Sequence, residues 1–544
     1  MEEPLAAPAA ASVAASAAAE TAKEAAAAAV TATEAAAASN GKEAAAVPAT
    51  TGAAAAASAA IQASKKRKLH LHDGQDPPAS DNCGDADHIS RLPDAVLGSI
   101  VSLLATKEGA RTQAISRRWR PLWRSAPLNL VVNRELINKT HKLIDLIPKI
   151  LSEHRGPTRR FLLCFCIDDC YDKIEGWLSS QALDSLQELQ LNPKLWFADR
   201  KKLYPLPPAA CRFSPTLRVA KFHGFHLPDL IGHLSLKFPC LEQLTLERVT
   251  ISEDALQSML SGCPALESLE LKENLGIARL CISSQTLKSL GFCVDSRYGG
   301  VFLQELVIED APCLERLLAL DPKGGPATIR IICAPKLEIL GMLSEDISEL
   351  HLGRTIFQKG VAISLTTKMH TMRVLVFSPV GPDLDAVVNF LKCFPCLERL
   401  YVIFQPLSRA IYYIGNARKY DPLHPIECFQ LHLKKVVLKN YDGENSAFIN
   451  FAKFFLLNAK ALKEMKITSP YHRQHNFFAN IQSKLRDQLR ASPDAQIELR
   501  CGTRDYFTRN KHTHDLSMND PFDMPSIGCW RCKELGLGDT TYQV

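Results

Sequence analysis

Two pairs of metal-binding residue types near the carboxyl end are the first candidates for chemistry. His512-x-His514 and Cys529-x-x-Cys532 offer imidazole and thiolate ligands of the kind that hold zinc. A structural zinc site takes such pairs from one compact module, whereas here fourteen residues, prolines among them, separate the two pairs. We therefore expect residues 503–544 to form a tail without structure, and we expect no bound metal or other cofactor.

The rest of the chain lacks the sequence patterns of common enzymes. It has no Gly-rich phosphate loop, no nucleophile elbow and no His-Glu-x-x-His pattern. The sequence thus offers no candidate catalytic residues, and we expect that the protein is not an enzyme. The net charge of +6 over 544 residues is small and argues neither for a nucleic-acid partner nor for a membrane-surface partner, and we expect neither.

Cysteine usage and hydrophobicity define the expected environment. The 17 cysteines are scattered among apolar neighbours, as in Leu163-Cys164-Phe165-Cys166. A reduced cysteine in such a place behaves as a small apolar residue, so we expect a reducing compartment and no disulfides. No strongly apolar run reaches the roughly 18 residues that a membrane-spanning helix needs.

The elements that carry the clearest functional signal lie in residues 87–132. Pro93 suits the start of a helix, and Asp94 suits the positive end of its dipole. Two apolar rows then follow at helical spacing, which predicts packing partners on two sides of this helix. The rows are Leu92, Val96, Ile100, Leu103 and Leu97, Val101, Leu104.

This segment resembles an F-box of the plant type, with Leu92-Pro93-Asp94 at its start and Ser116-Arg117-Arg118-Trp119 near its end. The resemblance implies a three-helix domain that binds the Skp adaptor of a cullin–RING ubiquitin ligase. It implies adaptor contacts from Leu92, Pro93, Ile100 and Leu104, and a domain core that includes Val96 and Trp119. The alternative is that the apolar residues only build a helical bundle. Arginines beside Trp119 and Trp123 are better explained by this domain than by nucleic-acid binding.

The amino-terminal 86 residues have the composition of a disordered arm. Alanine makes up 32 of the first 60 residues, without an amphipathic pattern that could pack. The arm contains the basic cluster Lys65, Lys66, Arg67 and Lys68. Such a cluster is either a nuclear import signal or a solvated charge run. We expect the protein in the nucleus, the cytoplasm or both.

Residues 133–425 contain a repeated phrase. Five copies of Pro-x-Leu-Glu-x-Leu begin at Pro239, Pro264, Pro312, Pro335 and Pro395, with spacings of 25, 48, 23 and 60 residues. Each phrase predicts a short strand with alternate leucines facing a core, which stacked units bury together. This part resembles the divergent leucine-rich repeats of plant F-box proteins. Outward-pointing residues would line a concave face and bind a target, or would be merely solvated: Gln243, Thr245, Glu247, Ser268, Glu270 and Lys272.

Residues 426–502 resemble the FBD domain, which follows an F-box and repeats in plant proteins. The stretch from Cys428 to Gly443 reads as a strand and a turn, and it leads into an apolar helix from Ala447 to Leu457 and then into a strand at 465–467. This unit would close the open end of the repeats. Gly443 predicts a turn that needs a positive φ angle.

Together these patterns predict an α+β, α/β-repeat chain: an arm, an F-box, a leucine-rich-repeat solenoid and an FBD unit of βαβ type. The resemblances imply the substrate-recognition subunit of an SCF-type ubiquitin ligase, whose partners are the adaptor and an unknown target protein. The alternative is a non-degradative scaffold or nuclear regulatory protein outside a ligase.

Overall fold

The structure is a computed structural model that divides into two compact units, residues 1–189 and 190–544. It describes residues 89, 91–132, 140–194, 203–227, 237–295, 299–321, 324–344, 347–358, 361–364, 367–379, 381–405, 425–469, 477–486, 490–501, 512–523 and 541–543. The predicted arm, residues 1–86, lies outside the described residues.

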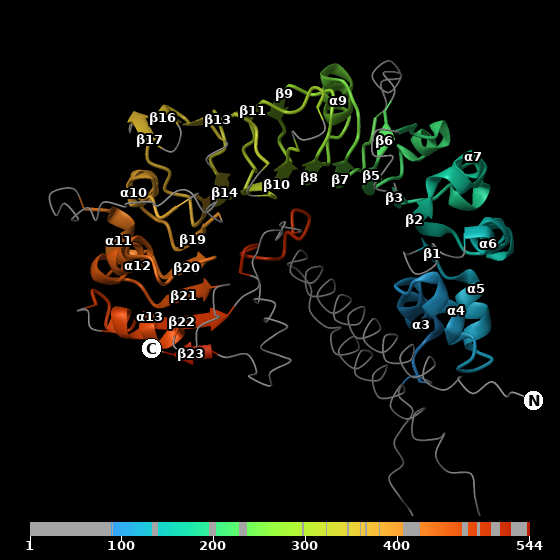
Figure 1. Ribbon diagram of the computed structural model, residues 1–544. Coiled ribbons are helices and arrows are strands. Elements are labelled where there is room, and N and C mark those ends of the chain that lie inside the picture. Colours follow the sequence, from blue (N-terminus) through green and yellow to red (C-terminus); the bar gives the residue numbers. More distant parts are fainter. Residues whose placement is uncertain are drawn as a thin grey trace, which may run out of the picture. The chain divides into compact units, whose positions relative to one another are not determined.

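The described part of unit 1 first contains three short helices, α3 (Asp94–Ser102), α4 (Thr106–Thr112) and α5 (Trp119–Ser125) (Figure 1). Trp119 and Trp123 of α5 are buried, and Gly109 of α4 provides the space for Trp123. A Cβ atom at Gly109 would lie 2.2 Å from the Trp123 ring, so the close packing of α4 on α5 requires glycine there.

The interior of this helical group differs from the predicted one at Val96. Leu97 and Val101 are fully buried, whereas Val96 is 37% exposed and Leu103 is 40% exposed. Placing Val96 in the core was therefore wrong, while Trp119 is in the core as predicted. Two apolar rows of similar strength compete for the interior, and packing against α5 decides which one is buried.

The rest of unit 1 is alternating strand and helix. Strand β1 (Leu128–Val132) pairs in parallel with β2 (Thr158–Cys166). The helices are α6 (Thr140–Glu153), α7 (Ile167–Leu178) and the short 3-10 helix η2 (Gln181–Leu183). Strand β3 (Glu188–Lys194) spans the boundary between the units.

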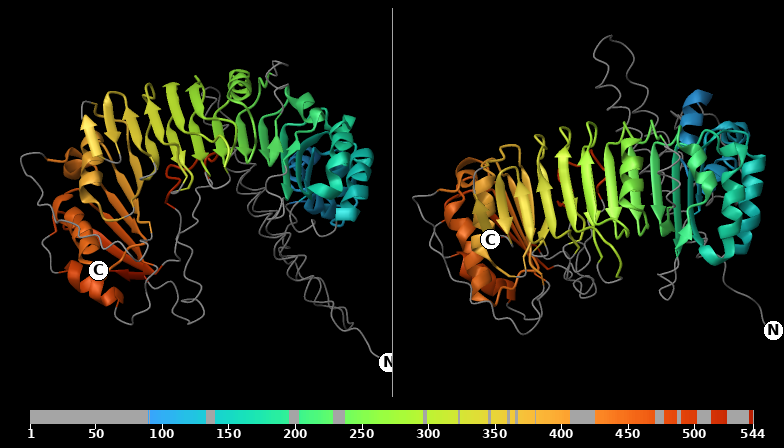
Figure 2. Two further views of the ribbon diagram at one scale, coloured as in Figure 1. Left: turned by 45° about the horizontal axis from the view of Figure 1, so that its top comes forward. Right: turned by 90° about the horizontal axis from the view of Figure 1, so that it is seen from above.

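Unit 2 is built around a row of parallel strands, seen edge to edge in Figure 2. Their order is β5 (Val219–His223), β7 (Gln243–Glu247), β8 (Ser268–Lys272), β10 (Ser289–Cys293), β12 (Arg316–Ala319), β14 (Ile339–Ser344), β18 (Val374–Ser378), β19 (Arg399–Ile403), β20 (Lys435–Lys439), β21 (Glu464–Ser469) and β22 (Gln496–Cys501). Strand β23 (Thr541–Gln543) pairs antiparallel at the end.

Every copy of the repeated phrase leads into one of these strands, namely β7, β8, β12, β14 and β19. The long spacings contain an extra strand that lacks the phrase, β10 in one case and β18 in the other. The glutamate of the phrase joins neighbouring strands. The Glu242 carbonyl accepts the N–H groups of Glu267 and Ser268 at 2.9 and 3.0 Å, and its carboxylate binds Arg218.

A second sheet contains the returning segments of the repeats. The parallel strands β9 (Arg279–Ser283), β11 (Glu305–Asp310), β13 (Thr328–Ile331) and β15 (Glu349–Leu352) are followed by antiparallel β16 (Thr355–Gln358) and β17 (Val361–Ser364). Strands β4 (Tyr204–Pro205) and β6 (Phe225–His226) form a small parallel pair. The 3-10 helix η3 (Pro208–Phe213) lies between them in the sequence. Helices α9 (Glu253–Ser261) and α10 (Leu384–Cys393) begin at side-chain caps, Ser252 and Asp383.

The region after residue 425 alternates helix and strand. Helices α11 (Glu427–Leu431), α12 (Ser446–Asn458) and α13 (Phe477–Arg486) accompany β20, β21 and β22. Gly443 precedes α12 as predicted, but it is not among the glycines with positive φ. Its role is steric, because a Cβ atom there would lie 2.2 Å from the Ile481 side chain of α13.

Candidate functional site

The strands of unit 2 present two faces, and the cross-strand register shows which residues share each face. Residues directly paired in parallel strands point to the same side. One row therefore contains Gln243, Ser268, Ser289, Arg316, Ile339, Val374, Arg399 and Lys435. The row two residues further on the same side contains Thr245, Glu270, Gly291, Leu318, Val376, Tyr401 and Val437. We call this side of the sheet, opposite the repeat leucines such as Leu244, the tail face.

Residues 512–523 lie on the tail face, and we call them the docked segment. They are the red trace beside the strands of unit 2 in Figures 1 and 2. The segment crosses the strands, because its hydrogen bonds run from β7 and β8 at one end to β20 at the other. The expectation of a tail without structure is therefore wrong for these twelve residues and for the three residues of β23.

His514 binds the β7 and β8 end of the tail face through both ring nitrogens. Its Nε2 lies 2.7 Å from the Thr245 hydroxyl, and its Nδ1 lies 2.7 Å from the Ser268 hydroxyl. Ser268 also donates to the Thr513 carbonyl at 3.0 Å, which uses its single proton. Nδ1–H must then donate to Ser268, while the Thr245 hydroxyl can either donate to Nε2 of a neutral ring or accept from Nε2–H of a charged one.

The electrostatics agree with a neutral ring. Burial lowers the pKa of His514 from 6.5 to about 4. The negative charge of Glu270 opposes this shift, whereas Lys221 and Lys272 reinforce it. Next to His514, Thr513 is fully buried and packs where β10 has Gly291. Any side chain at Gly291 would collide with Thr513, whose oxygen would be 2.4 Å from an added Cβ.

Arg316 holds the middle of the docked segment by its backbone. Its guanidinium donates to the carbonyl oxygens of Asp515, Leu516 and Met518 at 2.7, 2.9 and 2.6 Å. Burial lowers the pKa of Arg316, and nearby carboxylates such as Glu315 and Asp515 oppose the shift. Five donors in a planar fork let one arginine satisfy several carbonyl groups that would otherwise lose water.

Asp520 makes the most complete contact of the segment. One carboxylate oxygen accepts from Arg399 at 3.0 Å and from the Tyr401 hydroxyl at 2.7 Å. The other oxygen accepts the N–H of Phe522 at 3.0 Å, which fixes a tight turn. The Asp520 side chain is only 5% exposed. Burial and the Asp520 charge both raise the pKa of Tyr401, so its hydroxyl remains a donor.

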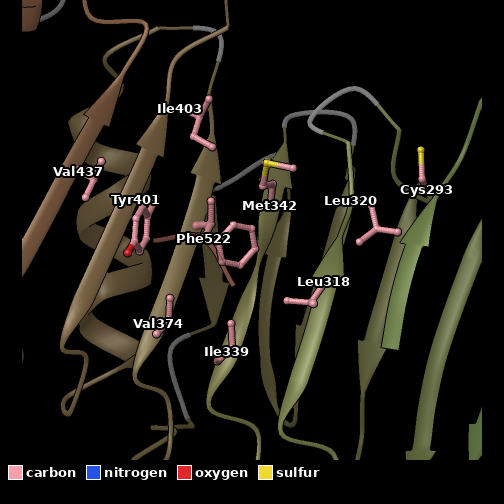
Figure 3. Close-up of a cluster of buried hydrophobic side chains, with 11 residues drawn as sticks. Cys293, Leu318, Leu320, Ile339, Met342, Val374, Tyr401, Ile403, Val437 and Phe522 are labelled. Atoms are coloured by element: carbon pink, nitrogen blue, oxygen red, sulfur yellow. The ribbon is translucent and has the colours of Figure 1, made fainter. Parts of the chain in front are cut away.

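Phe522 packs into a cluster of buried apolar side chains on the tail face (Figure 3). Its ring centroid lies 6.1 Å from that of Tyr401. The side chains clustered with it come from six strands, β10 to β20 along the sheet: Cys293, Leu318, Leu320, Ile339, Met342, Val374, Val376, Tyr401, Ile403 and Val437. Phe522 itself is only 7% exposed.

Lys435 binds the end of the docked segment. Its Nζ lies 2.7 Å from the Asp523 carboxylate and 3.3 Å from Glu464. Burial is the largest single effect and disfavours the charged lysine, but the hydrogen bonds and negative charges of Asp523 and Glu464 together outweigh it and raise the pKa of Lys435. Lys435 in turn lowers the pKa of Asp523 against the opposing effect of burial. Arg399 and Lys435 thus each bind an aspartate of the segment, while Arg316 binds its backbone.

The six predicted target-binding residues all lie on the tail face, and the structure brings them into one patch on β7 and β8. Thr245, Ser268 and Glu270 are buried, and the first two bind His514. Gln243, Glu247 and Lys272 are partly exposed. Burial would raise the pKa of Glu247, but His223, whose Nδ1 lies 3.5 Å from the carboxylate, and the nearby cations Lys272 and Arg248 lower it to about 2.

The sequence reasoning missed Arg316, Arg399, Tyr401, Lys435 and the segment that they bind. A signal was present in the continuous apolar runs Val374–Phe377 and Leu400–Ile403. Such runs, without alternation, are typical of strands buried on both faces. These runs indicated that the second face of the strands is also buried, but they did not indicate that Phe522 of the docked segment buries it.

Unit 1 has a second candidate surface, formed by exposed apolar side chains. Ile115 is 63% exposed, and Val96 and Leu103 are exposed as well. Of the predicted adaptor contacts, Pro93 is exposed, while Leu92, Ile100 and Leu104 are partly exposed. Arg118 joins the two ends of the motif, since it donates to the Leu92 carbonyl at 2.6 Å and to Asp94 at 2.7 Å.

Other predicted features are only partly within the described residues. Lys65, Lys66, Arg67, Lys68, Cys529 and Cys532 lie outside them. Among the residues that the structure does describe, no His, Cys, Asp and Glu side chains cluster as metal ligands. None of the described helices is long and apolar enough to cross a membrane.

Comparison with known proteins gives matches over most of the chain. Residues 174–402 match the LRR repeats of FBD-associated F-box protein At5g56370, and residues 421–467 match the FBD domain. Putative F-box/FBD/LRR-repeat protein At5g44960 of Arabidopsis thaliana is 28% identical over 76% of this chain and 99% of its own length. Putative F-box/FBD/LRR-repeat protein At5g44950 of the same plant is 29% identical over 70% of this chain and 92% of its own.

Proposed function

We propose a role for this chain from its family: it belongs to the F-box/FBD/LRR-repeat proteins, with both the repeats and the FBD domain matched. The proposed role is the substrate-recognition subunit of an SCF-type ubiquitin ligase. Residues 87–132 would be the F-box that binds the Skp adaptor, and unit 2 would bind a target protein. Partner enzymes would transfer ubiquitin, so the chain would need no catalytic residues of its own.

The observation that carries the proposal is the exposed apolar surface of the three-helix group. On α3, Val96 lies four residues before Ile100, and Leu103 lies three residues after it at the end of the helix. All three side chains are accessible to solvent. Water-exposed large apolar residues gathered on one helix are typical of a protein interface. The interior of the group is meanwhile filled by Leu97, Val101, Trp119 and Trp123, so the exposed row is available without unfolding.

Co-purification of the full chain with a Skp adaptor and a cullin tests this role. Val96→Asp together with Leu103→Asp should lower adaptor binding at least tenfold, because each places a charge in the centre of an apolar interface. Arg120→Asp is the matched control, since Arg120 is exposed on α5 and remote from the apolar row in sequence. It should leave adaptor binding unchanged.

Equal adaptor binding by the Val96/Leu103 variant and the native chain would contradict the F-box assignment. Adaptor binding without cullin, or without ubiquitin transfer to any bound protein, would instead favour a non-degradative scaffold. The proposed contribution of the receptor to ubiquitin transfer is to hold its target at a high effective concentration near the partner enzymes. Location in the nucleus, the cytoplasm or both remains a prediction from the basic cluster.

A further inference from the structure

The tail face has an arrangement of groups that belongs to a peptide-binding site. Along the paired row from β12 to β20 the residues are Arg316, Ile339, Val374, Arg399 and Lys435. Basic residues therefore flank an apolar centre. The described residues of the docked segment that meet this row are a backbone stretch at Arg316, Asp520 at Arg399, Phe522 at the apolar centre and Asp523 at Lys435.

These contacts recognise a particular kind of sequence. Arg316 binds carbonyl oxygens, which every peptide carries, so it holds a backbone without selecting side chains. Arg399 and Tyr401 require a carboxylate, and the apolar centre requires a large ring two residues later. Lys435 then selects a second carboxylate directly after the ring. The spacing is Asp-x-Phe-Asp, as in Asp520-Pro521-Phe522-Asp523.

We propose that this part of the tail face is a recognition site for an acidic peptide with an aromatic residue between two carboxylates. In this structure the site is occupied by the chain's own residues 520–523. These residues act as a displaceable ligand of the same chemistry as a target segment. Reading the external peptide as a ubiquitination target rests on the proposed function, but the binding itself does not.

The contacts of the segment are those of a ligand bound to a formed surface. Its described residues contribute no strand to the sheet and bind mainly through side chains and carbonyl groups of the segment to side chains of the strands. The row beneath it is held in register by strand pairing that does not include the segment. A tethered ligand competes at high effective concentration, so an external peptide must be longer, tighter or more abundant to displace it.

The test uses the full chain and a fluorescein-labelled peptide of residues 512–523 as the probe. In an opened variant, His514→Ala, Asp520→Ala and Phe522→Ala together remove the side chains that hold the segment in place. By fluorescence anisotropy this variant should bind the probe at least tenfold more tightly than the native chain. Adding Arg399→Ala and Lys435→Ala to the opened variant should reverse the gain, and a probe with Asp520→Ala and Phe522→Ala should bind no chain.

Equal probe binding by the native chain and a folded opened variant would overturn the proposal, as would binding that persists without Arg399 and Lys435. If the opened variant does not fold, hydrogen–deuterium exchange of the native chain tests independently whether the docked segment can be displaced. Amides of residues 515–523 should exchange at least tenfold faster than those of β19 and β20, because the segment opens locally. Exchange of both at the same rate would mean that the segment is a fixed part of the fold. No adaptor or cullin is present in either experiment, so the outcome is separate from that of the ligase role.

Discussion

Single residues on the tail face are tuned to one protonation state. Both nitrogens of His514 are used by hydroxyl groups, and burial disfavours its charged form. Asp520 and Asp523 instead bind as carboxylates beside Arg399 and Lys435. Docking therefore favours the neutral imidazole, and protonation of an undocked His514 below its ordinary pKa of 6.5 opposes docking.

The docked segment should loosen as the solution becomes acidic. The pKa of His514 is lowered from 6.5 to about 4, so its contribution is complete above pH 6.5 and is lost as pH falls toward 4. A tenfold change in proton affinity corresponds to about 1.4 kcal/mol, so the whole contribution is on the order of 3 kcal/mol. Hydrogen–deuterium exchange of residues 515–523, corrected for intrinsic rates, should show less protection at pH 5 than at pH 7.

His514→Gln is the control for this prediction, because glutamine can hydrogen-bond to Thr245 and Ser268 but does not titrate. Protection in that variant should change far less between pH 5 and pH 7. The same pH dependence in both chains would assign the effect to other groups. The groups facing His514 are Glu270, Lys221 and Lys272.

Strands are the elements on which the two faces of unit 2 depend. In β7, Leu244 and Leu246 point into the repeat core, and Thr245 between them points to the tail face. The same alternation holds in β8, where Leu269 and Leu271 are buried on the core side. Neighbouring residues of one strand thus serve two separate purposes, the stacking of repeats and the binding of the segment.

Substitutions at adjacent positions of β7 should separate these two purposes. Leu244→Asp puts an unpaired charge in the core and should destabilise unit 2 by about 4 kcal/mol or more. Thr245→Val keeps the volume and removes only the hydroxyl that binds His514, so it should cost about 1 kcal/mol, confined to docking. Thermal unfolding followed by circular dichroism compares the two. An equal loss of thermal stability in both variants would mean that Leu244 and Thr245 do not lie on opposite faces of β7 as the alternation requires.

At the scale of the whole molecule, the two proposed binding surfaces lie in different compact units. The exposed apolar row belongs to residues 1–189, and the tail face belongs to residues 190–544. Each surface has its own core, around Trp119 and Trp123 in the first and around the repeat leucines in the second. Damage to one surface therefore leaves the packing of the other intact.

The two binding activities should be independent. Val96→Asp with Leu103→Asp, introduced into the opened variant, should lower adaptor binding at least tenfold and leave probe affinity within about twofold, because sites that share no partners contribute additively. Anisotropy titration and adaptor co-purification of the same preparation measure both. A large loss of probe affinity would show that the units are energetically coupled.

Local patterns in the sequence determined the elements and the family. The phrase Pro-x-Leu-Glu-x-Leu marks strand starts because proline, alternation and leucine act within about six residues. The same kind of signal indicated the repeats and the FBD domain, which the family matches confirm. The sequence also placed Thr245 and Glu247 on one face of their strand, since alternation in a strand needs no tertiary information.

Only the tertiary structure decided what covers each face. Thr245 and His514 are 269 residues apart, and no local pattern relates them. Val96 and Leu97 were equally plausible as core residues until packing against α5 chose between them. Periodicity shows that a face is apolar, but contact between segments far apart in the chain depends on shape and charge that only the folded chain brings together. The tail face is such a case, because Phe522 completes a cluster whose other members lie between residues 293 and 437.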